Sequence, residues 1–120
     1  MAKILIVDDD ILITGLMQTL TSIDGHETIV VNDSSEAMET ALAEKPNLIT
    51  LDLMMPHLSG YELCEMLRAN PQFAQTPIII ISAKEDTQSK EKAFKLGATE
   101  YITKPFDIDY FLKTIKRLTT

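Results

Sequence analysis

The feature that most constrains the fold is the mostly apolar run at residues 48–51, which ends in the lone carboxylate of Asp52. A run of this kind is typical of a strand that is covered on both faces, as the strands of parallel sheets are. In open parallel α/β sheets, ligands bind in the crevice at the carboxyl ends of the strands. The sequence therefore predicts that Asp52 faces a binding site.

Four other short segments have strand character, and helical patterns separate them. The predicted strands are residues 3–7, 26–31, 48–51, 78–81 and 99–103. After each strand, apolar residues recur at the three- and four-residue spacing of an amphipathic helix. Strands that alternate with helices through short connections predict a parallel sheet with right-handed crossovers. The predicted fold class is therefore α/β, a doubly wound (βα)5 three-layer sandwich around a parallel five-stranded sheet.

The apolar spacing also predicts which helical side chains face the core. They are Leu12, Ile13, Leu16, Met17, Leu20 and Ile23, then Ala37, Met38, Ala41 and Leu42, then Leu63, Met66 and Leu67, then Ala93, Phe94 and Leu96, and finally Ile108, Phe111, Leu112, Ile115 and Leu118. The fourth helix, expected from Lys84, has hardly an apolar residue before Ala93. Because it has so little apolar area to bury, we expect its first half to be loosely held.

Polar residues at the expected helix starts have the spacing of N-caps and capping boxes. They are Asp10, Asp33 with Glu36, Ser59 with Glu62, and Asp107. Phe106 is expected to pack on Phe111 as a hydrophobic staple at the start of the last helix. These signals predict where the helices begin.

Length and composition limit the class of protein. A chain of 120 residues is long enough for one core, so we expect a single domain over residues 1–120. No apolar run approaches the length of a membrane span, and the single cysteine, Cys64, suits a reducing compartment. The formal net charge of −7 argues against a direct electrostatic grip on nucleic acid. We therefore expect a cytoplasmic domain that contacts neither nucleic acid nor membrane directly.

Chemically notable side chains follow four of the predicted strands. Asp8 and Asp9 follow the first, Asp52 the third, Ser82 the fourth and Lys104 the fifth. Because parallel strands place their carboxyl ends at one edge of a sheet, these groups are expected to meet. Three carboxylates together repel one another, and a hard divalent cation such as Mg²⁺ offsets that charge. A hydroxyl and an ammonium group beside the cation complete a cradle for a phosphoryl group, so the pattern predicts Mg²⁺-assisted phosphoryl chemistry on an aspartate.

Each of these residues also has a simpler interpretation on its own. An acid after a strand often caps the next helix, and Asp10, nearest the helix, fits that role best. Ser82 alone is typical of a turn, Lys104 of a surface lysine, and Tyr101 of half-buried packing in a strand. Only the joint placement of the groups at the strand ends favours a functional site.

Four blocks of the chain, "ILIVDDD", "LITLDLMMPHLSGYEL", "IIIISA" and "GATEYITKPF", together resemble the receiver domain of two-component response regulators. The blocks occur in the order and spacing of that family, and the resemblance covers essentially the whole chain. It implies a flavodoxin-like sheet with strand order 2-1-3-4-5. It also implies a phosphorylation-dependent signalling switch.

The resemblance implies a role for each group at the metal site. Asp52 resembles the phosphoacceptor, which takes a phosphoryl group from a phosphohistidine on a sensor histidine kinase or a phosphotransfer protein. Asp9 and Asp52 resemble direct Mg²⁺ ligands, with the backbone carbonyl of Met54 as a third ligand and Mn²⁺ as a substitute ion. Asp8 would act indirectly, through water or by orienting Lys104. Lys104 resembles the family's lysine that pairs with a phosphoryl oxygen.

The resemblance further implies how the signal leaves the site. Ser82 resembles the switch hydroxyl, and Tyr101 the aromatic residue that changes rotamer when Ser82 moves toward the phosphoryl group. The output surface would comprise the fourth helix, the strand at residues 99–103 and the last helix, and would bind a downstream protein or output domain. Two such surfaces could also pair about a two-fold axis in a homodimer on phosphorylation. The chain would catalyse its own phosphorylation and dephosphorylation at Asp52 without a multiple-turnover activity.

Two other functions compete with this prediction. A haloacid-dehalogenase-type phosphohydrolase would use Asp8 and Asp10 as its D-x-D pair, but it gives residues 52–56 no role and expects Thr or Val where Leu12 stands. A receiver-shaped interaction domain that is never phosphorylated is the third interpretation. It is disfavoured because every chemical position is filled.

Overall fold

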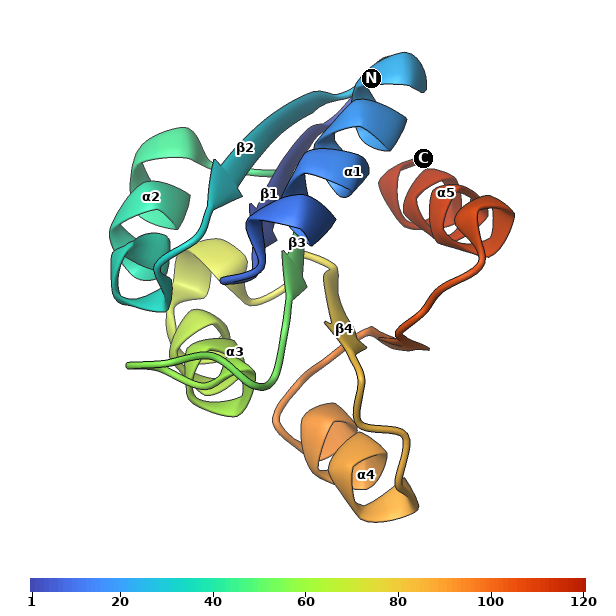
Figure 1. Ribbon diagram of the computed structural model, residues 1–120. Coiled ribbons are helices and arrows are strands. Elements are labelled where there is room, and N and C mark those ends of the chain that lie inside the picture. Colours follow the sequence, from blue (N-terminus) through green and yellow to red (C-terminus); the bar gives the residue numbers. More distant parts are fainter.

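The computed structural model describes residues Met1–Thr120 and contains one parallel five-stranded sheet (Figure 1). Its strands are β1 (Lys3–Val7), β2 (Glu27–Val31), β3 (Leu48–Leu51), β4 (Ile78–Ser82) and β5 (Glu100–Thr103). The helices are α1 (Ile11–Ile23), α2 (Ala37–Glu44), α3 (Gly60–Ala69), α4 (Thr87–Lys95) and α5 (Ile108–Thr119), and two 3₁₀ turns are η1 (Ser34–Glu36) and η2 (Pro71–Phe73). The strand order β2-β1-β3-β4-β5 confirms the predicted fold class and topology.

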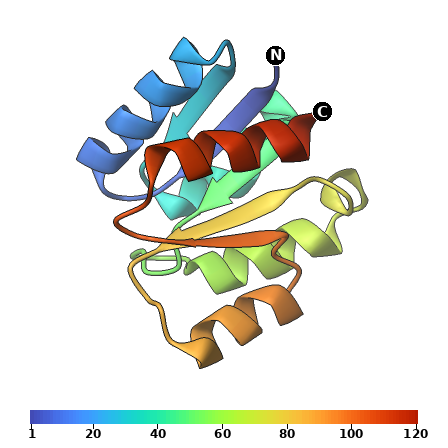
Figure 2. The same ribbon diagram turned by 90° about the vertical axis from the view of Figure 1, so that its right-hand side faces the viewer.

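The sheet is the middle of three layers. Helices α1 and α5 cover one face, and α2, α3 and α4 cover the other (Figures 1 and 2). Successive residues of a strand therefore enter different cores: Ile4 and Ile6 of β1 pack in the cluster below α1 and α5, and Leu5 and Val7 pack in the cluster on the opposite face. Because both faces are covered, the central strands need apolar residues at almost every position, which explains the continuous apolar runs.

The predicted core face of α1 is confirmed for Ile13, Met17 and Leu20, which pack in or against the cluster on this side of the sheet, and is wrong for the other three side chains. Leu12 is 85% exposed and Ile23 80% exposed, and Leu16 is also exposed. Beside the predicted Met17, the buried face includes two threonines that were not predicted to be inward, Thr14 and Thr21. The Thr21 hydroxyl donates to the Met17 carbonyl oxygen at 2.8 Å, so this polar group is satisfied inside the core. Counting apolar residues misplaced the helix face because threonine can be buried when the helix backbone accepts its hydrogen bond.

Other helices also differ from prediction at individual positions. Side chains predicted to be inward but exposed in the structure are Leu42, Met66, Phe94 and Ile108. Asp33 caps η1 by accepting the Ser35 N–H, and Glu36 forms no capping-box hydrogen bond. The expected fourth helix begins at Thr87 rather than Lys84, because the carboxylate of Asp86 caps it by accepting the Ser89 N–H.

Three of the predicted caps are confirmed. Asp10 caps α1, Asp107 caps α5, and Ser59 and Glu62 form a complete capping box at the start of α3. The rings of Phe106 and Phe111 pack with their centroids 4.9 Å apart, as the staple predicted. No helix combines the length and the apolar character that crossing a bilayer requires.

Candidate functional site

Strand register brings two acids side by side at one edge of the sheet. Val7 of β1 pairs with Leu51 of β3, so Asp8 and Asp52, which directly follow these residues, lie next to each other at the ends of two neighbouring strands. The Asp52 N–H donates to the Val7 carbonyl oxygen at 3.1 Å, which continues the ladder to the end of the strands. Asp8 and Asp52 are both buried, whereas Asp9 is exposed.

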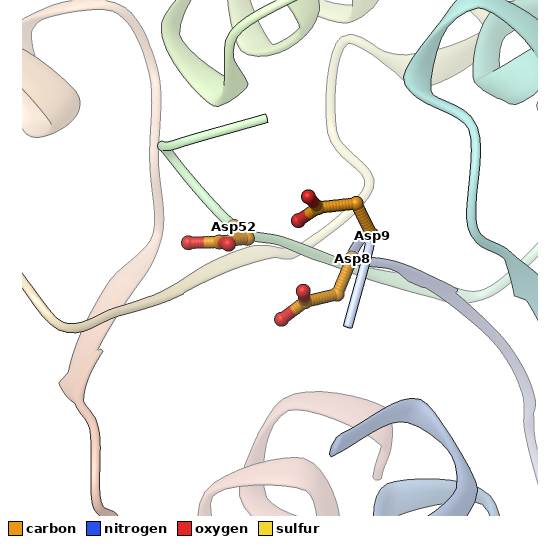
Figure 3. A group of neighbouring side chains, drawn as sticks. All are labelled: Asp8, Asp9 and Asp52. Atoms are coloured by element: carbon orange, nitrogen blue, oxygen red, sulfur yellow. The ribbon is translucent and has the colours of Figure 1, made fainter. Parts of the chain in front are cut away.

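The three predicted acids form one cluster. Figure 3 shows the carboxyl groups of Asp8, Asp9 and Asp52 extending toward the same side of the strand ends. One oxygen from each lies within 4.8 Å of the others. A group of three carboxylate oxygens at this spacing suits a hard cation such as Mg²⁺, which prefers oxygen ligands. The donor set therefore fits the predicted metal.

Lys104 lies between two of these acids. Its Nζ is 2.6 Å from Asp8 Oδ2 and 3.5 Å from Asp52 Oδ2. The Lys104 N–H also donates to the Ser82 carbonyl oxygen at 2.8 Å, so the turn after β5 is attached to the end of β4. The structure thus brings Lys104, at the end of β5, into contact with Asp8 and Asp52 at the ends of β1 and β3. This is the meeting of strand ends that the sequence predicted.

The electrostatics of the site follow from this crowding. Burial, and then the negative charge of Asp8, raise the pKa of Asp52, although Lys104 acts in the opposite direction. Burial alone would lower the pKa of Lys104, but its hydrogen bond to Asp8 and the charges of Asp8 and Asp52 raise it overall. The crowding therefore disfavours the ionised form of Asp52, which a bound cation would stabilise.

Both carboxylate oxygens of Asp8 accept hydrogen bonds from other residues of the chain. Its Oδ1 accepts the Asp10 N–H at 2.9 Å, and its Oδ2 accepts from Lys104. Asp10 itself turns away from the cluster, because its carboxylate caps α1 by accepting the N–H groups of Leu12 and Ile13. An Asp8–Asp10 pair of the phosphohydrolase kind is therefore not formed.

Ser82 and Tyr101, the predicted switch residues, meet at the backbone of one residue. The Oγ of Ser82, which is fully buried, accepts the Lys84 N–H at 3.3 Å. The Tyr101 hydroxyl donates to the Lys84 carbonyl oxygen at 2.6 Å. Burial raises the pKa of Tyr101, so this hydroxyl stays protonated and keeps its donor at neutral pH. Ser82 and Tyr101 are thus linked through Lys84, a connection that the sequence did not reveal.

Two residues of the site were missed by the sequence. A Cβ on Gly60 would overlap the carbonyl oxygen of Asp52 and the backbone of Leu53, so only glycine allows α3 to start this close to Asp52. Ser34, on the η1 turn, contacts the loop after β3. Neither contact has a local sequence signal, because each depends on how distant segments approach one another.

Comparison with known proteins assigns the family. The family model of the response regulator receiver domain matches residues 4–116. The chain belongs to this family. Among solved structures of similar receivers, the chemotaxis protein CheY4 of Vibrio cholerae has a TM-score of 0.93 at 31% identity, with 98% of each chain covered. The BeF3-activated receiver domain of Klebsiella pneumoniae RstA has a TM-score of 0.92 at 27% identity, covering 98% of this chain and 99% of that one.

Sequence relatives include receivers of different length. The alkaline phosphatase synthesis transcriptional regulatory protein PhoP of Bacillus subtilis is 42% identical over 104 residues, which are 87% of this chain and 42% of PhoP. The protein PilG of Pseudomonas aeruginosa is 34% identical over 114 residues, 95% of this chain and 84% of PilG. The matched region is 52% of the response regulator ArlR of Staphylococcus saprophyticus. The chain thus spans about half the length, or less, of relatives such as ArlR and PhoP.

Proposed function

We propose that this receiver is a phosphorylation-dependent signalling switch with Asp52 as the phosphoacceptor. The observation that carries the proposal is the position of Asp52, beside the Lys104 ammonium group and within a cluster of three carboxylates. The phosphoryl donor would be a phosphohistidine on a sensor histidine kinase or a phosphotransfer protein. Residues 1–120 would then act as one receiver domain.

The groups of the chain suit this transfer. A carboxylate oxygen of Asp52 bonds to phosphorus as the phosphorus–nitrogen bond of the phosphohistidine breaks, and the bonding electrons leave with the imidazole. Lys104 can pair with a phosphoryl oxygen from its position 3.5 Å from Asp52. Lys104 also stays anchored through Asp8, which accounts for the indirect role of that acid.

Asp9 and Asp52 would hold Mg²⁺ directly, with the backbone carbonyl of Met54 as a third ligand. When bound, the cation would offset the carboxylate charges and stabilise the charge on the transferring phosphoryl group. Mn²⁺, which also takes oxygen ligands, would substitute. The Met54 N–H lies 3.4 Å from Asp52 Oδ1, so the loop that carries this carbonyl already follows the phosphoacceptor closely.

The signal would leave through Lys84. A phosphoryl oxygen would accept a hydrogen bond from the Ser82 hydroxyl, and the movement of Ser82 Oγ toward it would pull on the Lys84 N–H that donates to this oxygen. The carbonyl group of Lys84 is in turn held by Tyr101. A shift of Lys84 alters the segment before α4, and a population shift of this kind changes the α4–β5–α5 surface. A downstream protein or output domain would bind that surface, and two copies would pair through it as a homodimer.

The proposal includes a cytoplasmic location, which the single cysteine suits, and no direct contact with nucleic acid or membrane. Autophosphorylation from a small donor and autodephosphorylation would both occur at Asp52, with one phosphoryl group per chain. Multiple turnover of phosphate monoesters is not expected.

The test is labelling with radioactive acetyl phosphate and Mg²⁺. We expect one phosphoryl group per chain in the wild type, none with EDTA, and none in Asp52→Asn. Asp10→Asn is the matched control, because it removes a neighbouring carboxylate that caps α1 outside the cluster, and it should label like the wild type. Labelling of Asp52→Asn, or repeated hydrolysis of phosphate monoesters that Asp10→Asn abolishes, would refute the proposal.

A further inference from the structure

The hydroxyl of Ser34 closes the loop that follows the phosphoacceptor. Ser34 lies on η1, between β2 and α2, and is 2% exposed. Its Oγ donates to the Pro56 carbonyl oxygen at 2.6 Å and accepts the Leu58 N–H at 3.0 Å. Both contacts join residues more than 20 positions apart. The hydroxyl therefore uses its donor and an acceptor on a single distant loop.

The residue between these two contacts has an unusual backbone. His57 has φ +72°, the left-handed region that a residue with a side chain rarely adopts. Such a conformation persists only where the surrounding structure fixes it. Ser34 holds the carbonyl group just before His57 and the N–H group just after it. One hydroxyl thus fixes the left-handed turn from both sides.

The other end of the loop is also fixed. The Gly60 N–H donates to the Leu53 carbonyl oxygen at 3.0 Å, at the point where a side chain on Gly60 would not fit. Met54 lies between these two attachments, and its N–H approaches Asp52 Oδ1 at 3.4 Å. The position of the Met54 peptide group therefore depends on the Leu53–Gly60 contact on one side and the Ser34 contacts on the other.

We propose that Ser34 is a positioning residue for the metal site: its hydroxyl pre-organises the β3–α3 loop so that the Met54 carbonyl is presented beside Asp52. The inference rests on the proposed function, because it takes Met54 as a ligand. Groups that orient metal ligands from outside the coordination sphere strengthen metal binding by removing the cost of ordering the ligand. Without the Ser34 hydroxyl, the loop would have to be ordered when Mg²⁺ binds. The loss of this hydroxyl therefore lowers the affinity for Mg²⁺.

The chain offers a matched control in the next residue. The Ser35 hydroxyl donates to Asp33 Oδ1 at 2.7 Å, and the hydrogen bonds to the loop come from Ser34. Ser34→Ala and Ser35→Ala each remove one hydroxyl from the same 3₁₀ turn, but only Ser34→Ala releases Pro56 and Leu58. Ser34→Thr keeps the hydroxyl and tests whether that group, rather than the fit of the side chain, is responsible.

The experiment measures Mg²⁺ titration by NMR, amide hydrogen exchange at Leu58, and the rate of labelling from acetyl phosphate. We expect Ser34→Ala to weaken Mg²⁺ binding by about fivefold, somewhat less than the effect of removing a direct partner of a ligand. Exchange at Leu58 should accelerate by about tenfold, since its acceptor is lost. The labelling rate at saturating Mg²⁺ should stay within about twofold of the wild type, because the defect lies in affinity. Ser35→Ala and Ser34→Thr should bind Mg²⁺ like the wild type.

Equal Mg²⁺ affinity in Ser34→Ala and Ser35→Ala would overturn the inference, as would an equal loss in Ser34→Ala and Ser34→Thr. A wild type that binds Mg²⁺ but takes no label at Asp52 would refute the proposed function and leave the affinity test of Ser34 intact. A wild type that binds no Mg²⁺ would overturn both.

Discussion

Among single residues, Asp52 shows a conflict between stability and reactivity. Its side chain is buried beside Asp8, and burial and the Asp8 charge raise its pKa despite Lys104. A pKa that is higher in the folded state means that ionised Asp52 destabilises the fold. This cost is fully present above the folded pKa and disappears as the pH falls below the unfolded value of 3.8. The ionised Asp52 carboxylate, which the proposed phosphoryl transfer requires, therefore lowers the free energy of unfolding.

Replacing Asp52 by Asn should stabilise the metal-free protein. Asn keeps the shape of the side chain but removes the buried charge, so we expect the free energy of unfolding in EDTA at pH 7 to rise by about 1 kcal/mol. Urea unfolding measures this change. The difference should shrink as Mg²⁺ is added, because only the wild type gains the full free energy of binding. A variant that is less stable than the wild type in EDTA would contradict the pKa shift of Asp52.

Some residues of the site could be predicted from the sequence, and others could be found only in the structure. Asp8, Asp52 and Lys104 were predictable because each follows a strand, and parallel strands fix which ends meet. Gly60 and Ser34 were not predictable, because their importance lies in close approaches between segments that no periodicity describes. Sequence reasoning therefore found the groups to which the chemistry is assigned in the proposed function, and it missed the groups that fix the loop and helix beside them.

At the scale of elements, α4 buries Ala93 in the core and is further attached to its neighbours by polar contacts. The Lys92 ammonium group lies 4.3 Å from the centre of the Tyr61 ring, and Tyr101 holds the Lys84 carbonyl group ahead of the helix. Asp86 caps the first turn, accepting from both the backbone N–H and the hydroxyl of Ser89. The loose attachment expected for the first half of α4 stays a prediction, and the cap is the feature through which it can be tested.

The cap of α4 should weaken in acid. The hydrogen bonds from the Ser89 hydroxyl, and then from its backbone N–H, lower the pKa of Asp86 below 3.8. A lowered folded pKa means that the cap contributes fully above pH 3.8 and is lost as the pH falls through the lower folded value. The amide shift of Ser89 in NMR spectra should therefore titrate with a midpoint below 3.8.

Asp86→Asn is the control for this titration, because Asn caps helices without a charge. The Ser89 amide shift should lose its acid transition in this variant while α4 remains formed. A Ser89 midpoint at or above 3.8 in the wild type would contradict the expected direction of the shift.

The helices also show why their existence was easier to predict than their orientation. Asp10 and the Ser59–Glu62 pair act locally, so their caps were read correctly. The buried face of α1 depends on where the sheet lies, and Thr21 enters the core by bonding to the helix backbone while Leu12 stays exposed. Apolar spacing cannot distinguish these two sides when a helix carries apolar residues around most of its circumference.

At the scale of the whole molecule, Arg68 joins segments that the sheet alone does not connect. Its guanidinium group donates to the Phe73 and Thr76 carbonyl oxygens, both at 2.6 Å, and to the Gly97 carbonyl oxygen at 2.9 Å. These acceptors belong to the connection between α3 and β4 and to the turn between α4 and β5. The single side chain therefore ties two connections at the end of the sheet opposite to Asp52 and supplies a hydrogen-bond donor to three carbonyl oxygens there.

Arg68→Met should consequently lower the global free energy of unfolding by about 3 kcal/mol, or about 1 kcal/mol for each of the three hydrogen bonds to a carbonyl oxygen that it removes. Arg117→Met is the matched control, since it removes the same charge from an exposed ion pair, 2.9 Å from Glu100, and should cost less than about 1 kcal/mol. Urea unfolding of both variants separates the buried hydrogen bonds from the change in net charge that the two share. If the two variants lose similar stability, Arg68 acts only through its charge. A larger loss in Arg68→Met shows instead that the fold depends on a cation whose partners are backbone carbonyl groups, in contrast to Lys104, whose partners at the opposite edge of the sheet are the carboxylates of Asp8 and Asp52.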